Sequence, residues 1–501
     1  MDSENSLLKR AWAYQVEGMF DRAMECYRRT IEADPNCAGA YYNLALIFRE
    51  KGEDDTALSH FTRAIKIDPD LAMAYGARGE LHRKLGNCGE ALVDFARALE
   101  LDPESEAVYL NRGLLFMELD RVDDAIADYT EAIEIAPGFT RAYARRGAAL
   151  NIAGQYRRAI TDLDVAIDYE CSDWEHFLCR GDAHYNNRDF DRAIADYSRA
   201  IELNPGCAEA LDKRGDAYDL KGDHEKALED YERARGLEPA GGSYCLHKGQ
   251  TLVAMGEFDE AMQYYNWALD LDPDDHMVYN LRGQLYFLLG VYGHAVEDQA
   301  EALDRRPDVA RYYFDRATAY GEMEMYERAV EDYSMAVDLN PFFIDAFFNR
   351  GITHGRMEKY AEAVADFTEV IRLNPDDADA RLNRGRIFAE KGDTREAMAD
   401  LQRAVELDPG MAAAHFALGN VYGERGSLME AASEFALAAE LEPGESRAFF
   451  GRAYALDEMG NAHAAVEAYR KFIEVAGSST DPVVAGLIET AEKRIGEIEG
   501  C

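Results

Sequence analysis

The chain has 501 residues, of which 54 are lysine or arginine and 96 are aspartate or glutamate, so its formal net charge is −42 at pH 7. A chain this acidic repels the phosphates of nucleic acids and anionic membrane surfaces, and it attracts basic partners at a rate that falls with salt. The composition therefore argues against a nucleic-acid-binding protein.

The N-terminal stretch, residues 1–15, shows no targeting signal. It lacks a basic region followed by an apolar stretch, and no apolar run in the chain approaches membrane-spanning length. The eight cysteines contain no C-x-x-C pair, which predicts reduced thiols and neither a zinc site nor a disulfide framework. We therefore expect a cytoplasmic protein without membrane insertion and without a cofactor.

Residues 208–239 show the pattern that the rest of the chain repeats. Small and apolar residues recur at spacings of three, four and seven in two runs, which predicts two amphipathic helices. Gly222 between the runs predicts a left-handed helix stop, and Asp223 is then placed to cap the second helix. The first run contains Leu211, Gly215 and Tyr218, and the second contains Ala227, Tyr231 and Ala234.

The prolines give the period of this helical hairpin. All but Pro482 of the 13 lie 34 residues apart, with one gap of twice that length in which Cys171 stands in the place of a proline. Counting from them gives fourteen repeats over residues 4–479, without insertion or deletion. The repeats start at residues 4, 38, 72, 106, 140, 174, 208, 242, 276, 310, 344, 378, 412 and 446.

Three positions inside the repeat are restricted. The eighth is always Gly or Ala, the twentieth is always Ala, and the twenty-fourth is mostly aromatic. Two helices cross closely only where neither side chain intrudes. We therefore expect the aromatic ring at the twenty-fourth position to fill the space that the small residues leave.

A 34-residue period with these small and aromatic positions resembles the tetratricopeptide repeat (TPR) family. One departure is the fourth position, where the family often has Trp and this chain has mainly Tyr, Phe or Leu. The resemblance implies an all-α, right-handed superhelical solenoid of helix-turn-helix repeats. It also implies that the first helix of each repeat lines the inner groove, with positions 2, 5, 6, 9 and 12 facing a ligand.

A charge pair recurs along the repeats. The seventh position is basic in twelve repeats, and the twenty-third is Asp in nine, all of which have Arg at the seventh. We expect Arg–Asp pairs that join the two helices, within one repeat or between neighbours. The alternative is that both positions merely favour solvated charge.

The first of three groove linings is partly basic. In this family, repeats that hold the acidic C-terminal tails of chaperones use Lys, Asn, Asn and two basic residues at set positions. Asn111, Arg141 and Arg145 match the last three of these five positions. Gly76 and Glu80 occupy the first two, and Glu80 would repel a carboxylate, so this clamp is an alternative reading.

The second lining, in the sixth and seventh repeats, is acidic. Four of its carboxylates are spaced three, four and three residues apart and share one helical face, where like charges are mildly destabilising. In a chain of this charge the face can simply be solvated, or it can bind a Lys- and Arg-rich segment. The candidate residues are Glu175, Asp182, Glu209, Asp212, Asp216 and Asp219.

The third lining, over the last five repeats, is apolar. Large residues at the fifth position accompany small ones at the twelfth, such as Gly321 and Gly423, which leaves a shelf for an extended apolar peptide or an inserted helix. The alternative is that the large side chains pack between adjacent helices. The candidate residues are Phe314, Phe348, Leu382, Phe416 and Phe450.

After the last repeat, Asp481 and Pro482 begin a further amphipathic helix, so residues 480–501 are expected to form a capping helix and tail. The chain contains no H-E-x-x-H, phosphate-binding glycine loop or G-x-S-x-G motif. His176 and His184 lie eight residues apart on one helix, which is a poor spacing for a shared metal. We therefore expect no catalytic, metal or cofactor site.

These patterns together predict a non-catalytic scaffold that binds proteins or peptides, with basic and apolar segments, in its concave groove. One alternative is a co-chaperone-like module that holds an acidic C-terminal tail at the partly basic lining. Another is a self-assembling structural subunit, a homo-oligomer formed through the first hairpin with Leu7, Leu8 and Trp12.

Overall fold

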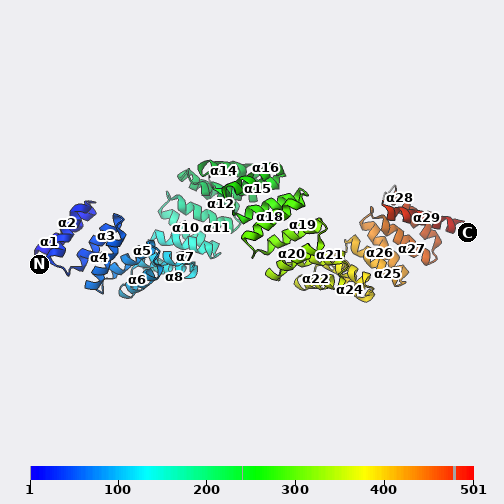
Figure 1. Cartoon of the computed structure of the whole chain (residues 1–501), viewed down its shortest axis with the longest axis horizontal. Helices are drawn as coiled ribbons and strands as arrows, with labels where there is room; N and C mark the ends of the chain where they lie inside the picture. Colours follow the sequence, from blue (N-terminus) through cyan, green and yellow to red (C-terminus); the bar gives the residue numbers. More distant parts are fainter. Residues whose placement is uncertain (1, 240, 478–480, 501) are drawn as a thin grey trace. The chain divides into compact units, whose positions relative to one another are not determined.

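The computed structural model describes residues 2–239, 241–477 and 481–500 of the chain. Over these residues it contains 29 α-helices and no strand, so the chain is an all-α helical repeat solenoid (Figure 1). No helix in the described part combines the length and the apolar character that crossing a bilayer requires. The chain divides into two compact units, Met1–Met255 and Gly256–Cys501, which we call the N-terminal unit and the C-terminal unit.

The described residues of the N-terminal unit form the helices α1 to α15. They are α1 (Asp2–Val16), α2 (Phe20–Ala33), α3 (Ala38–Glu50), α4 (Asp54–Ile67), α5 (Ala72–Lys84), α6 (Cys88–Leu101), α7 (Glu106–Glu118), α8 (Val122–Ile135), α9 (Thr140–Ile152), α10 (Tyr156–Tyr169), α11 (Trp174–Asn186), α12 (Phe190–Leu203), α13 (Ala208–Leu220), α14 (His224–Leu237) and α15 (Gly242–Met255).

The described residues of the C-terminal unit form the helices α16 to α29. They are α16 (Phe258–Leu271), α17 (His276–Leu288), α18 (Tyr292–Arg305), α19 (Ala310–Glu322), α20 (Tyr326–Leu339), α21 (Ile344–Arg356), α22 (Tyr360–Leu373), α23 (Ala378–Glu390), α24 (Thr394–Leu407), α25 (Ala412–Glu424), α26 (Leu428–Leu441), α27 (Ser446–Glu458), α28 (Ala462–Ala476) and α29 (Pro482–Glu499).

Two consecutive helices form a hairpin, and a tight turn connects them. Gly222, between α13 and α14, has a φ of 82°, so the left-handed stop predicted there is confirmed. Asp223 is the N-cap residue of α14, but its side chain makes no capping hydrogen bond, so the predicted cap is wrong. Its carboxylate lies 3.1 Å from the Lys226 ammonium in the first turn of α14, which competes for it.

Glycine at the eighth position of a repeat lies against the aromatic ring at the twenty-fourth. A Cβ atom added to Gly215 would lie 2.5 Å from Cε1 of Tyr231, closer than two carbon atoms can approach. Tyr231 itself is 1 % exposed. The predicted packing is confirmed. The same close approach of the position-24 side chain is found at Gly79, Gly113, Gly147, Gly181, Gly351, Gly385 and Gly419.

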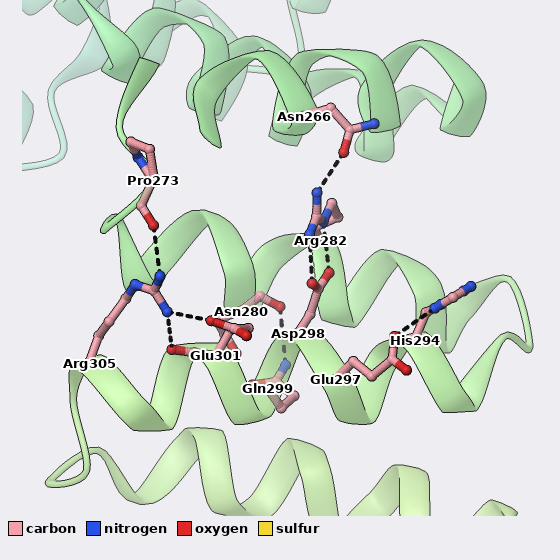
Figure 2. Close-up of polar contacts among 10 residues, drawn as sticks. All are labelled: Asn266, Pro273, Asn280, Arg282, His294, Glu297, Asp298, Gln299, Glu301 and Arg305. Atoms are coloured by element: carbon pink, nitrogen blue, oxygen red, sulfur yellow. Dashed lines mark hydrogen bonds and ion pairs between the residues drawn. The ribbon is translucent and has the colours of Figure 1, made fainter. Parts of the chain in front are cut away.

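The ninth repeat departs from this core. Its twenty-fourth position is Gln299, which is 1 % exposed and whose Nε2 donates to the Asn280 carbonyl oxygen at 3.2 Å (Figure 2). The Oε1 atom of Gln299 and the Oδ1 atom of Asn280 are buried and have no hydrogen-bond partner among the described residues. In this repeat, polar side-chain oxygens thus lie in the part of the core that an aromatic ring fills in most other repeats.

The predicted Arg–Asp pairs are present. Figure 2 shows Arg282 of α17 donating from Nε and Nη2 to the two carboxylate oxygens of Asp298 on α18, at 2.8 and 2.7 Å. The Nη1 atom of Arg282 also donates to Oδ1 of Asn266 on α16, at 2.6 Å. One guanidinium therefore joins both helices of its own repeat to the second helix of the preceding repeat.

The same bidentate arrangement recurs along both units. All nine Asp residues are only 3–7 % exposed, so each carboxylate is buried while its arginine partner is half-buried. The eight further pairs are Arg78–Asp94, Arg112–Asp128, Arg146–Asp162, Arg180–Asp196, Arg214–Asp230, Arg316–Asp332, Arg350–Asp366 and Arg384–Asp400.

The last helix, α29, packs against α28. Its Val484 and Ala491 are buried in a cluster with Tyr469 and Phe472. Arg494 donates to Asp457 of α27 at 2.6 Å, which joins α29 to the hairpin before it. The predicted boundary between residues 479 and 480 lies outside the described residues.

Candidate functional site

The acidic lining lies in the N-terminal unit, on α11 and α13. Asp182 accepts hydrogen bonds from Nζ of Lys213 at 2.7 Å and from the hydroxyl of Tyr197 at 2.9 Å. Asp216 accepts one from the hydroxyl of Tyr231 at 2.7 Å. The aromatic residues of the core thus extend their hydroxyls to carboxylates of the lining.

His247 of α15 lies over two of the carboxylates. Its Nδ1 is 2.9 Å from Oδ1 of Asp212 and 3.3 Å from Oδ1 of Asp216. Asp219 is paired with Nδ1 of His224 at 2.8 Å. With Glu209, which lies 3.0 Å from Nζ of Lys213, five of the six predicted acidic residues therefore already face a basic side chain of this chain.

Glu175 and Glu209 are the exposed members of the acidic lining. The Glu209 side chain is 59 % exposed and lies 3.0 Å from Nζ of Lys213. The Glu175 carboxylate has no ion-pair partner among the residues that the structure describes. Sequence analysis missed that Lys213 and His247 offset the lining. Both stand at the sixth position of their repeats, which the resemblance directs toward the groove.

A cavity of about 240 Å³ opens beside these groups. The carboxylates of Asp182 and Asp216 and the Lys213 ammonium, which pairs with Asp182, all line it. A cationic group that entered it would meet two acceptors but also one like charge. The lining residues are Asn151, Asp182, Tyr185, Asn186, Tyr197, Lys213 and Asp216.

Asp182, Asp216 and the nearby His247 have shifted pKa values. Burial raises the pKa of Asp216 to about 6, and burial also raises that of Asp182. For His247, burial favours the neutral ring, but the hydrogen bond to Asp212 and the charges of Asp216 and Asp212 outweigh it, so its pKa is raised. The site therefore takes up protons more readily than isolated side chains do.

Asp216→Asn is expected to stabilise the fold at pH 7 by about 1–2 kcal/mol and to have little effect near pH 4. The folded chain holds the Asp216 proton up to about pH 6. The unfolded chain releases it near pH 3.8. Stability is therefore lost as pH rises through this window. Chemical denaturation at several pH values measures the change in the free energy of unfolding, and the exposed Glu209→Gln serves as the control. An equal gain at pH 4 and pH 7 would contradict this reasoning.

The five apolar candidates lie in the C-terminal unit and differ in exposure. Phe314 and Leu382 are buried at 9 % and 5 % exposure, whereas Phe348, Phe416 and Phe450 are half-buried. Each of the four Phe rings lies 5.6–5.8 Å from the ring at the twenty-fourth position of its own repeat. One face of each ring thus continues the core.

Phe416 and Phe450 line a cavity of about 710 Å³ that the helices α23 to α27 border. Gly423 of α25 borders it, and a Cβ atom at this glycine would touch nothing within 4 Å, so the space above it is open. Tyr454 of α27 also borders the cavity and is 53 % exposed. The large rings of Phe416, Phe450 and Tyr454 thus line one part of the cavity, and the small Gly423 leaves another part open.

Arg386 of α23 reaches the same cavity. Burial and the nearby charge of Arg447 lower its pKa. Among the described residues it has no ion-pair partner, while Arg447 is held by Glu445 at 2.8 Å. Glu390 and Glu424 border the cavity too, so its polar rim carries both signs of charge.

The partly basic lining of the N-terminal unit keeps two arginines available. Arg141 and Arg145 are exposed, and in the described part of the chain neither has a hydrogen bond or ion pair. The amide of Asn111 donates to the Ala107 carbonyl of its own helix at 3.0 Å. Glu80, which counted against this clamp, is paired with Arg49 at 2.7 Å.

Two clusters among the described residues bring carboxylates and an imidazole together closely enough for one metal ion. One consists of Asp212, Asp216 and His247, and the other of Glu170, Asp173 and His176. In each cluster the three donor atoms lie within 4.8 Å of one another. His184, whose spacing from His176 predicted no shared metal, belongs to neither.

Comparison with known families gives one consistent result. Models described as tetratricopeptide repeat match residues 8–72, 77–138, 178–242, 348–412 and 416–482, and another matches 310–343. A model described as TPR repeat matches residues 249–290. No curated protein sequence is significantly similar to the chain.

Several solved structures resemble the chain. The Cut9 and Hcn1 hetero-tetramer of the APC/C matches at 14 % identity over 97 % of this chain and 96 % of that chain, with a TM-score of 0.38. YrrB, a TPR protein with an unusual peptide-binding site, matches at 27 % identity, with a TM-score of 0.34. The match covers 40 % of this chain and 99 % of the YrrB chain. A tetratricopeptide repeat protein from Parabacteroides merdae matches at 21 % identity, with a TM-score of 0.38. The match covers 50 % of this chain and 100 % of that protein's chain.

Proposed function

The chain belongs to the tetratricopeptide repeat family, and we propose that it is a non-catalytic scaffold that binds a segment of a partner protein against the apolar lining of its C-terminal unit. Proteins of this family are in general interaction scaffolds. The observation that supports the proposal is the cavity of about 710 Å³ at Phe416 and Phe450. Its volume lies within the range of about 300–1,000 Å³ that is usual for ligand-binding clefts.

The cavity favours a large apolar side chain as the anchor of the bound segment. Phe416 and Phe450 are half-buried, so the exposed parts of their rings can be covered by a ligand. Burial of one large apolar side chain contributes roughly 1.5–3 kcal/mol. Gly423 leaves room for the backbone of the segment, and the exposed amide of Asn420 on the same wall can bond to it.

Peptide binding by the full chain tests the proposal. The probe is an array of octapeptides with a central Phe, Leu, Ala or Asp, captured by the wild type, Tyr454→Ala and Phe416→Asn. Asparagine stands naturally at the same repeat position as Phe416 in the ninth repeat, as Asn280. We expect each variant to weaken binding of the Phe and Leu peptides about 10- to 100-fold.

The matched control is Phe342→Ala, which removes a ring that is 73 % exposed and does not border the cavity. It should leave capture unchanged. Equal capture of Phe and Asp peptides by the wild type would refute the proposal, and so would capture that neither cavity variant weakens.

A second candidate function is the binding of a basic segment at the acidic lining of the N-terminal unit. The net charge of −42 and the exposed carboxylates of Glu175 and Glu209 favour it. Because Lys213 and His247 already face the inner carboxylates, a Lys or Arg of the ligand would have to replace them. Such binding should be salt-sensitive and should be abolished by Asp216→Arg.

The same peptide array also tests a third candidate function, the co-chaperone-like clamp that holds an acidic tail. Capture of acidic peptides that Arg141→Ala and Arg145→Ala abolish, and that the cavity variants leave unchanged, would favour the co-chaperone-like clamp. That outcome would place the ligand on the N-terminal unit and would overturn the proposal for the C-terminal cavity.

A further inference from the structure

Three potential metal ligands meet at the turn between α10 and α11. Glu170 follows the last residue of α10, Asp173 is the N-cap residue of α11, and His176 lies in the first turn of α11. One donor atom of each lies within 4.8 Å of the other two. We propose that Glu170, Asp173 and His176 form a binding site for a divalent transition-metal ion of the zinc type.

The imidazole of His176 is buried without a hydrogen bond. His176 is 7 % exposed, and in the described part of the chain its Nδ1 has no hydrogen-bond partner. Its Nε2 lies 3.6 Å from Oδ2 of Asp173, which is too far for a hydrogen bond. The unpartnered atom is thus Nδ1, whereas Nε2 faces the Asp173 carboxylate without a hydrogen bond and is the nitrogen that a metal ion would bind.

The separation of these two atoms suits a shared ion. Ligand atoms about 2.0–2.2 Å from a tetrahedral zinc ion lie about 3.4 Å from one another. The 3.6 Å between Nε2 of His176 and Oδ2 of Asp173 is close to that value. The other carboxylate oxygen, Oδ1 of Asp173, accepts from the Glu175 backbone N–H at 2.9 Å. This bond holds the carboxylate so that Oδ2 points toward the histidine.

The residue types at this turn differ from those of the other repeats. The position of His176 is occupied by buried alanines in the two neighbouring repeats, Ala142 and Ala210. The turn also contains Cys171, which stands where twelve of the fourteen repeats have proline. Packing of the repeat therefore does not require a histidine at this position. The turn also lacks the proline ring that restricts the backbone at the corresponding turns of other repeats.

The other cluster, Asp212, Asp216 and His247, differs in one respect. Nδ1 of His247 already lies at hydrogen-bond distance, 2.9 Å, from Asp212. That imidazole is satisfied as an ion pair, and a metal would have to displace it. The turn of α10 and α11 offers one nitrogen and two carboxylates, a donor set of the kind that zinc accepts, with a coordination position left for water.

Zinc titration of the full chain, after treatment with EDTA, tests the site. The wild type is compared with His176→Ala, which introduces the residue of the neighbouring repeats, and with the control His247→Ala, which removes the imidazole of the other cluster. We expect one zinc equivalent in the wild type and in His247→Ala, and at least a tenfold weaker affinity in His176→Ala. Cobalt(II) should give visible d–d absorption that His176→Ala removes.

The possible results are distinguishable. Absence of zinc binding in the wild type overturns the proposal. Retained affinity in His176→Ala overturns it as well. Loss of the zinc equivalent only in His247→Ala would assign the ion to the other cluster and would likewise overturn the proposal. Circular dichroism of each variant without metal verifies that the helices are unchanged.

Discussion

Asp298→Ala is expected to lower the free energy of unfolding of the C-terminal unit by about 3–5 kcal/mol. The carboxylate is 5 % exposed and receives two hydrogen bonds from Arg282, whose side chain is 19 % exposed. Its removal leaves a guanidinium largely withdrawn from water with only Asn266 as a partner. Chemical denaturation of the full chain, followed by far-ultraviolet circular dichroism, measures the loss.

Two controls show whether the lone charge is the cause. Glu297→Ala removes a neighbouring carboxylate of α18 whose side chain is 74 % exposed, and it should cost less than about 0.5 kcal/mol. The double variant Arg282→Met/Asp298→Leu removes both charges and should recover most of the stability. If Asp298→Ala and Glu297→Ala cost the same, the pair does not stabilise the repeat.

Phe367→Ala is expected to cost about 3–5 kcal/mol of the free energy of unfolding. The ring is 1 % exposed, and it lies with its centroid 5.6 Å from that of Phe348. It also covers Gly351, where an added Cβ atom would be 3.1 Å from the ring. Truncation would leave a cavity among these groups. Thermal or chemical unfolding of the full chain measures the effect.

The reciprocal change tests the fit between the glycine and the ring. Gly351→Ala alone should have a modest effect, because four repeats carry alanine at this position, such as Ala317 and Ala453. In the Phe367→Ala background it should recover part of the loss, since its methyl group enters the vacated space. Phe342→Ala, at a site 73 % exposed, should stay within about 0.5 kcal/mol of the wild type. A cost for Phe367→Ala no larger than that would contradict the packing argument.

The two structural predictions concern features that most repeats share, whereas the proposed binding sites concern only a few repeats. Each of the nine Arg–Asp pairs and each glycine under a ring recurs at the same repeat position. By contrast, the cavity at Phe416 and Phe450 and the metal ligands near His176 each depend on a combination of residues found in only one part of the chain. A variant of the first kind is thus expected to change stability, and one of the second kind to change binding.

The apolar lining shows where a positional rule is insufficient. Phe314 and Phe416 occupy the same position in their repeats, yet Phe314 is 9 % exposed and Phe416 borders the large cavity. Phe314 is covered by Phe343, with ring centroids 5.0 Å apart, and the corresponding residue three repeats later is Glu445. The position directs both side chains to one surface, but the neighbouring repeat decides whether a ligand can reach them.

The sequence by itself determined the helices, the Arg–Asp pairs and the packing of small residues under rings. These features join positions at most 16 residues apart within one hairpin, as Arg282 and Asp298 are, so the period alone places them in register. Only the tertiary structure decided that Lys213 and His247 offset the acidic lining, and that the buried His176 lacks a hydrogen bond while facing Asp173. Asp182 contacts Lys213 across 31 residues, and Asp212 contacts His247 across 35. Contacts of this kind depend on how side chains of adjacent repeats meet and on which donors remain unpaired. A pattern of residue types does not contain that information.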